Sequence, residues 1–157
     1  MTHVKKIGKA ENNWQKLNKR TNENQSIEKI QMTQEMLAIE NRCNQLRSLK
    51  KGWHNGEGES INENQVMMAK NFIIVCLEQD YPFPIFGPDL DGNIEIEWQD
   101  KLLTVILNKN LRFHLESEFE DIIDLCLEDS IKELKKYFQW ILKNNFKGWW
   151  PNAYYVK

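Results

Sequence analysis

The sequence predicts an α+β domain in which two helices precede an antiparallel meander of three to four strands, and a long C-terminal amphipathic helix follows and packs on the sheet. Apolar residues recur every three or four positions over 26–49 and again over 119–142, whereas apolar and polar residues alternate over 94–98. Prolines and glycines separate these segments. A period near 3.6 indicates a helix with one buried face, and a period of two indicates a strand with one wet face.

The first two helices are bounded by recognisable end signals. The apolar stripe that begins after Ser26 is expected to end at Gly52, because glycine readily takes the left-handed turn that ends helices. The second helix is expected to begin at Ser60, which with Glu63 has the spacing of a capping box. The two prolines of YPFP end it, because proline lacks an N–H group and restricts the residue before it.

The strands follow from alternation and turn residues. In 94–98 the residues Ile94, Ile96 and Trp98 share one side, and the Asp91-Gly92 pair before them is expected to form a turn. The segments LLTVIL and LRFHL supply the next two strands, and in the latter Leu111, Phe113 and Leu115 share a side. PIF at 84–86 is a possible fourth strand at an edge, because its prolines suit only an edge.

The last helix is expected to start at Ser117, which with Glu120 offers a second capping box, and to end near Asn144. Acidic residues crowd its first turns and lysines its last ones, as the helix dipole favours. We therefore expect three segments: a polar basic arm over 1–25, a single α+β domain over 26–146 and an aromatic tail over 147–157.

Composition excludes several classes of protein. The 157 residues carry a formal net charge of −2, so no overall basic field draws the chain onto nucleic acid or anionic lipid. The first residues lack the apolar run of a signal peptide, and no apolar stretch approaches the ~20 residues of a membrane span. Cys43, Cys76 and Cys126 are far apart and predict reduced core thiols. We expect a cytoplasmic protein without a membrane contact.

Motifs for metal binding and nucleophilic catalysis are missing from the sequence. Neither CxxC, HxxxH nor HExxH occurs, and no serine lies in a GxSxG motif. The segment DLDGNIEIEWQD resembles a calcium loop, but its sixth position is Ile94 where such loops need glycine. We therefore expect no metal, no cofactor and no catalytic residue, although whether the protein is an enzyme stays open.

The stretch LKKGWHNGEGES, residues 49–60, concentrates glycine, tryptophan and histidine in one loop. We predict a structural corner formed by Gly52, Trp53, Gly56, Gly58 and Trp98, with the Trp53 ring buried between the helices and the sheet. The alternative is a small-molecule or nucleotide site at this loop. It would use His54 as an acid–base group, with Glu57 or Glu97 as its partner.

A resemblance supports the architecture of this corner. The residues Gly52, Trp53, Asn55, Gly56 and Gly58 match a GW-(D/N)-G-x-G loop. The hairpin pattern P-x-x-DG-x-I-x-(L/I)-EW is matched by Pro88, Asp91, Gly92, Ile94, Ile96, Glu97 and Trp98. The chain thus resembles a loosely defined family of small uncharacterised bacterial proteins. The resemblance implies a shared loop and hairpin, an origin among bacterial conflict genes, and no established activity.

Our leading hypothesis is a non-catalytic protein-binding module, such as an inhibitor, antitoxin or immunity protein of a bacterial or phage conflict system. Its acidic residues could imitate phosphate charge, and exposed Trp and Tyr side chains dominate interface energetics. The predicted partner-binding residues are Glu95, Glu97, Glu120, Asp121, Asp124, Glu128, Trp149, Trp150, Tyr154 and Tyr155. Nucleic-acid binding through the basic arm and the aromatic tail is a second alternative.

Overall fold

A computed structural model describes residues 33–98, 102–118 and 120–143. The chain divides into two compact units, Met1–Ile39 and Glu40–Lys157. Of the first unit, residues 33–39 are described, and they are helical. The predicted arm over 1–25 and the predicted tail over 147–157 lie outside the described residues.

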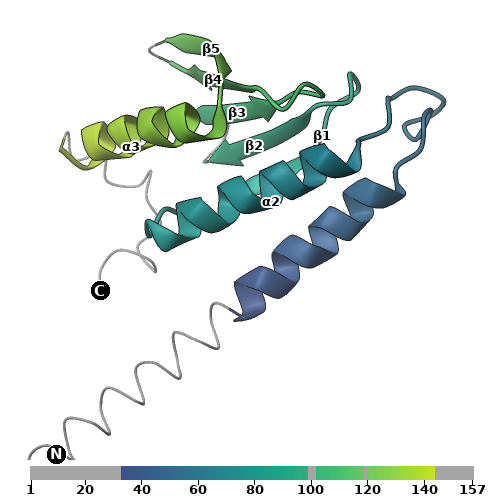
Figure 1. Ribbon diagram of the computed structural model, residues 1–157, viewed down its shortest axis with the longest axis horizontal. Coiled ribbons are helices and arrows are strands. Elements are labelled where there is room, and N and C mark those ends of the chain that lie inside the picture. The colour runs from purple at the N-terminus through teal and green to yellow at the C-terminus, as the bar shows by residue number, and fades with distance from the viewer. Residues whose placement is uncertain (1–32, 99–101, 119, 144–157) are drawn as a thin grey trace, which may run out of the picture. The chain divides into compact units, whose positions relative to one another are not determined.

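The second unit contains helical residues 40–48, two further helices and one antiparallel sheet (Figure 1). The strands lie side by side in chain order, from β1 at one edge to β5 at the other. In order, the elements are α2 (Glu63–Glu78), β1 (Ile85–Pro88), β2 (Ile94–Trp98), β3 (Leu103–Leu107), β4 (Phe113–Ser117), β5 (Asp121–Leu125) and α3 (Leu127–Lys143). The predicted α+β class is confirmed, but the meander has five strands rather than three to four.

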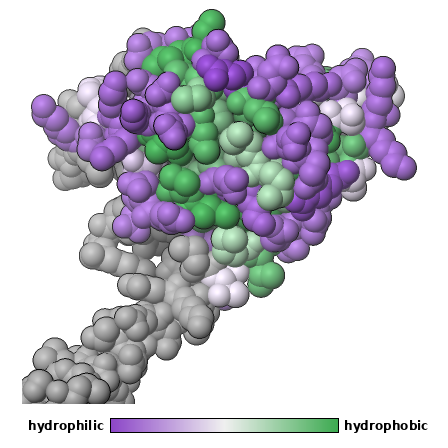
Figure 2. Space-filling model, viewed as in Figure 1, coloured by the Kyte–Doolittle hydropathy of each residue, from purple (hydrophilic) through white to green (hydrophobic). Residues whose placement is uncertain are grey.

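The helices α2 and α3 cover one face of the sheet (Figure 1). Phe72 of α2 stacks on Phe113 of β4 with ring centroids 5.0 Å apart, and Phe138 of α3 meets the edge of Trp98 at 5.8 Å. The Trp98 N–H donates to the Pro82 carbonyl at 2.8 Å, which satisfies the polar group of a buried ring. Apolar side chains gather in the middle of the view in Figure 2, with polar ones around them.

The second helix begins two residues later than the sequence predicts. Asn62 is its N-cap and forms the capping box with Gln65, instead of Ser60 with Glu63. The Gln65 amide is fully buried and donates to the carbonyls of Gly92 and Leu107, at 2.8 and 3.3 Å. With Asn62 as the cap, the third helical residue is Gln65, whose amide can donate these two bonds to the sheet. A glutamate carboxylate at this position could not donate them.

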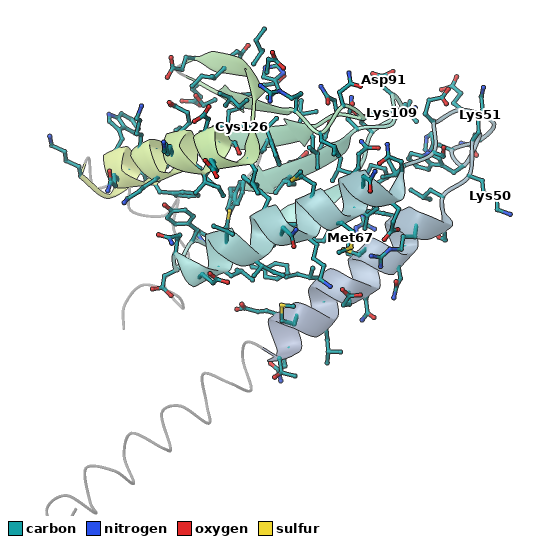
Figure 3. The ribbon with its side chains drawn as sticks, in the orientation of Figure 1. Lys50, Lys51, Met67, Asp91, Lys109 and Cys126 are labelled. Carbon is teal, nitrogen blue, oxygen red and sulfur yellow. The ribbon has the colours of Figure 1, made fainter. Side chains whose placement is uncertain are left out.

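The segment 121–125 is a strand, so the prediction of a helix from Ser117 is wrong. Ser117 does bond Glu120, but within the turn that joins β4 to β5. The helix α3 begins only at Leu127, and the Cys126 thiol, labelled in Figure 3, accepts from the Asp129 N–H at 3.4 Å. Cys126 therefore lies at a helix start and not on a buried helix face.

Two smaller boundaries also differ from the predictions. The first helix ends at residue 48, and Gly52, with a φ of +85°, lies in the turn that follows. Leu111 does not share a strand face with Phe113, because it takes a left-handed φ of 63° in the turn before β4. Within the described part of the chain, no helix combines the length and the apolar character needed to cross a membrane.

Candidate functional site

The corner at residues 49–60 is held by its own backbone. His54 and Glu57 exchange two backbone hydrogen bonds at 2.8 and 2.9 Å, and the Gly52 N–H donates to the Gly58 carbonyl at 2.7 Å. Gly52, Gly56 and Gly58 all take φ values between +85° and +101°, a region that disfavours a Cβ atom. The glycines therefore set the shape of the corner.

The Trp53 indole is fixed by this backbone but is only half-buried. Its N–H donates to the Glu59 carbonyl at 3.0 Å, and a Cβ at Gly58 would come within 2.5 Å of the indole nitrogen. The ring meets the His54 imidazole edge-on at 5.6 Å, whereas the described ring partners of Trp98 are Phe72 and Phe138. The prediction of a Trp53 ring buried between the helices and the sheet is therefore wrong, and Trp98 packs in the core rather than at the corner.

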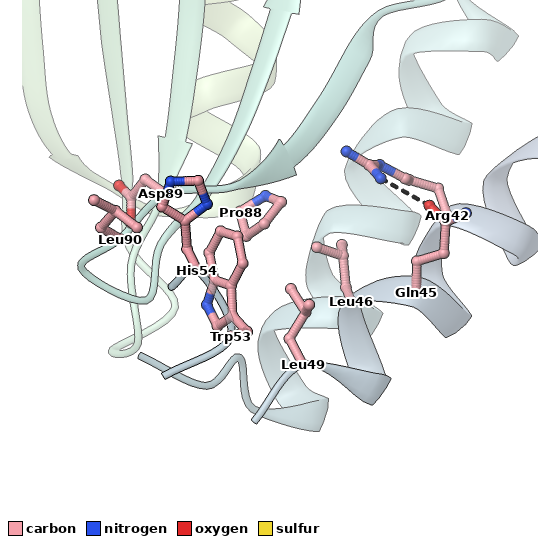
Figure 4. A pocket seen from close by; sticks show the side chains of 9 residues that line it. All are labelled: Arg42, Gln45, Leu46, Leu49, Trp53, His54, Pro88, Asp89 and Leu90. Atoms are coloured by element: carbon pink, nitrogen blue, oxygen red, sulfur yellow. Dashed lines mark hydrogen bonds between the residues drawn. The ribbon is translucent and has the colours of Figure 1, made fainter. Parts of the chain in front are cut away.

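The Trp53 ring instead lines an open cavity of about 460 Å³, which we name the corner cavity (Figure 4). The 89–93 turn lies against the corner, where the Glu59 N–H donates to the Leu90 carbonyl at 3.0 Å. The lining consists of Arg42, Gln45, Leu46, Leu49, Trp53, His54, Pro88, Asp89 and Leu90. It combines an apolar wall with one cation, one carboxylate and one imidazole.

Arg42 is held in place at one side of the corner cavity. Its Nε donates to the Phe86 carbonyl at 2.7 Å, and its Nη1 donates to the Gln45 side chain at 2.7 Å (Figure 4). Gly87 leaves the space that Nη2 occupies, because a Cβ there would come within 2.6 Å of it. In the described residues, none of the ion pairs involves Arg42. The guanidinium therefore offers an oriented positive charge to the cavity.

The Asp89 carboxylate, across the cavity from Arg42, is engaged by its own turn. One oxygen accepts from the N–H groups of Asp91 and Asn93 at 2.9 and 2.8 Å, and the other accepts from the Asn93 amide at 2.8 Å. These bonds shape the turn at Gly92, whose φ is +86°. Asp89 is thus a poor candidate for a general base, although it lies beside His54.

The structure does not bring together the acid–base groups that the sequence suggested for this loop. His54 is exposed and is paired with Glu57 through the backbone alone. Glu97 lies toward the far end of β2, whereas Ile94, at the near end, follows the 89–93 turn. Arg42 and Asp89 were not among the predicted site residues, and no local pattern marks either of them as part of a cavity.

A second group of functional candidates lies on the sheet face that faces away from α2 and α3. The strand register aligns Glu97, Thr104, Glu116 and Asp121 across four strands, and we name its three carboxylates the acidic row. Neighbouring strands lie about 4.8 Å apart, so Glu116 and Asp121 are directly opposed like charges. Glu116 was not among the predicted residues, although the alternation of β4 places it on the wet face.

The predicted partner-binding residues divide between several places. Glu95 shares the face of the acidic row, and Asp124, at the β5 edge, pairs with Arg112 at 2.8 Å. Glu120 lies in the turn between β4 and β5, and Glu128 is exposed in the first turn of α3, on the other side of the sheet. Trp149, Trp150, Tyr154 and Tyr155 lie outside the described residues.

His114 lies beside the acidic row, two residues before Glu116 on the same face of β4. Its Nε2 lies 3.8 Å from a Glu116 carboxylate oxygen, an ion pair only when the imidazole is protonated. This nitrogen is enclosed and has no hydrogen-bond partner among the described residues. A histidine thus lies within reach of the like-charged pair Glu116 and Asp121.

Neither the buried thiols nor the acidic side chains of the described residues form a reactive or ligating site. Burial raises the pKa of the Cys76 thiol far above its ordinary value and, with Glu40 nearby, also raises the pKa of the Cys43 thiol. Both thiols stay protonated at neutral pH, and a protonated thiol is a weak nucleophile. Across the described residues, no three His, Cys, Asp or Glu side chains converge as a metal site would require.

Comparison of the chain with family models, with curated proteins and with solved structures finds no match. The resemblance suggested by the loop and hairpin residues therefore stays a prediction.

Proposed function

We propose that this protein is a non-catalytic protein-binding module that presents the acidic row to a basic partner. An inhibitor, antitoxin or immunity protein, for example one that blocks a defence nuclease, would use such a surface. The observation that supports the proposal is the direct opposition of Glu116 and Asp121 across β4 and β5. Opposed like charges destabilise an antiparallel sheet, and local conflicts of this kind are typical of functional sites.

The row suits a partner that normally binds phosphates. Its carboxylates occupy strands β2, β4 and β5, with Thr104 of β3 between them, so negative charge extends across most of the sheet. Complementary charge of this kind speeds association and selects the partner more than it adds affinity. We place the protein in the cytoplasm because its three cysteines are free.

The proposal is tested by capturing the partner with a tagged protein from its natural host and comparing two triple variants. The first, Glu97→Gln/Glu116→Gln/Asp121→Asn, neutralises the acidic row. The control makes the same change of charge at exposed positions in the corner, at the end of α2 and just after it. This control is Glu57→Gln/Glu78→Gln/Asp80→Asn.

We expect the unaltered protein and the control to retain one stoichiometric partner, and the row variant to lose it. Added salt should weaken the retained complex, because it screens exposed charges. Recovery of no stoichiometric partner at moderate salt would contradict the proposal. Equal recovery by all three proteins would assign the contact to another surface.

A further inference from the structure

We propose that the corner cavity is a binding site for a small planar aromatic monocarboxylate. Arg42 would bind the carboxylate, and the Trp53 ring with its apolar neighbours would hold the aromatic part. This inference goes beyond the proposed protein contact and does not depend on it, because the cavity residues and the acidic row belong to separate parts of the unit.

Arg42 supplies the anion-binding group. A guanidinium has five N–H groups in a planar fork, and the Phe86 carbonyl and the Gln45 side chain use two of them. The remaining three lie on Nη1 and Nη2, the pair of nitrogens that grips a carboxylate end-on through two parallel bonds. The two internal bonds hold the fork in a fixed orientation, so less side-chain freedom is lost when a ligand binds.

Trp53 supplies the surface for the aromatic part. The indole N–H is already bonded to the Glu59 carbonyl, so the ring offers the cavity its apolar surface rather than a donor. Pro88, Leu46 and Leu49 continue this surface toward Arg42 (Figure 4). The volume of about 460 Å³ lies within the range of ordinary small-molecule sites, which combine an apolar wall with a few fixed polar groups.

The charges of the lining favour a monoanion over a phosphate dianion. Asp89 keeps a carboxylate on the opposite wall, and it is fixed there by three hydrogen bonds. A second negative charge on the ligand would gain from Arg42 but would be repelled by Asp89. His54, exposed at the same wall, can hydrogen-bond a polar substituent on the ring.

The test uses the whole chain and three probes of similar shape, observed by ligand-detected NMR and thermal shift. Indole-3-carboxylate is the expected ligand, indole-3-carboxamide is its neutral isostere, and phenyl phosphate carries the dianion. We expect the carboxylate to bind at least about tenfold more tightly than the amide, because hydrogen bonds to charged groups are the stronger ones. Equal binding of carboxylate and amide, tighter binding of the phosphate, or no binding at millimolar concentration would overturn the proposal.

Variants assign the binding to the cavity. Arg42→Gln should weaken carboxylate binding at least about tenfold and leave amide binding nearly unchanged. Gly87→Ala keeps every charge but displaces Nη2 and should also weaken binding of the carboxylate selectively. The control Lys51→Gln removes a positive charge from the same corner at an exposed residue that does not line the cavity (Figure 3). A loss of binding in the control equal to that in Arg42→Gln would refute a specific role for Arg42.

Discussion

Neutralising either carboxylate of the Glu116–Asp121 pair is expected to raise the free energy of unfolding. The two residues are directly opposed on antiparallel strands, and Glu116 leaves 46% of its side chain exposed. The variants Glu116→Gln and Asp121→Asn keep the shape of each side chain and remove one charge. Each single change should relieve the repulsion completely, because the repulsion needs both charges.

The magnitude follows from the geometry of the pair. Directly opposed residues place their Cβ atoms about 5 Å apart, so the carboxylates lie roughly 6 Å apart in water. Coulomb's law with a dielectric constant of about 80 then gives ~0.7 kcal/mol at low salt. At physiological ionic strength the Debye length of about 8 Å reduces this to roughly half. At low salt we expect a rise in Tm of about 2–4 °C.

The assay is thermal and urea unfolding of both single variants, the double variant and the exposed-site control Glu57→Gln at about pH 8. The double variant should gain no more than either single variant, since the two changes remove one shared interaction. Additive gains, a gain that salt does not reduce, or destabilisation by both single variants would refute the reasoning.

Three further predictions test the corner, the second helix and the thiols. Gly58→Ala should destabilise the fold by more than Gly56→Ala, as measured by urea unfolding; both positions have a positive φ, but only the Cβ at position 58 meets the indole. Gln65→Leu should lower the free energy of unfolding by about 2–3 kcal/mol, because it removes the buried bonds that the Gln65 amide donates to the Gly92 and Leu107 carbonyls and the one it accepts from the Asn62 N–H. In the native protein at neutral pH, a thiol reagent should modify Cys126 faster than Cys76. Burial raises the pKa of the Cys76 thiol and so lowers its thiolate fraction. Mass spectrometry would follow the two rates, and equal rates would contradict this prediction.

The sheet could be predicted wherever its two faces differ in burial. The strands β2 and β4 alternate between core and wet face, and alternation is visible in a single sequence, whereas the largely buried β3 follows from its apolar run between two turns. β5 was missed because Ile122 and Leu125 are three residues apart, the spacing of a helix face. In the structure the pairing of β4 with β5 shifts register, and Asp124 takes a left-handed φ of 59°. An irregularity of this kind inserts a residue and hides the period of two.

The start of α2 and the corner cavity depend on contacts between distant segments. Ser60 and Glu63 have the spacing of a capping box, but the structure places the cap at Asn62, where Gln65 also bonds Gly92 and Leu107, 27 and 42 residues away. The cavity likewise forms because Glu59 bonds Leu90, which brings the second wall to Trp53. Local patterns do not encode which distant carbonyl a donor will reach, so neither feature could be predicted.

The conformation of the corner is difficult to explain by packing alone. Between residues 52 and 58, four residues take positive φ values, and a glycine held in one conformation loses more entropy on folding than any other residue. Burying a tryptophan completely could offset such a cost, but Trp53 stays half exposed, and its N–H is bonded to the loop itself. The Trp53 ring thus lines the corner cavity, and its burial stabilises the loop by less than complete burial of the ring would. The exposed side of the Trp53 ring, which lines the corner cavity, is the surface that the proposed ligand would contact.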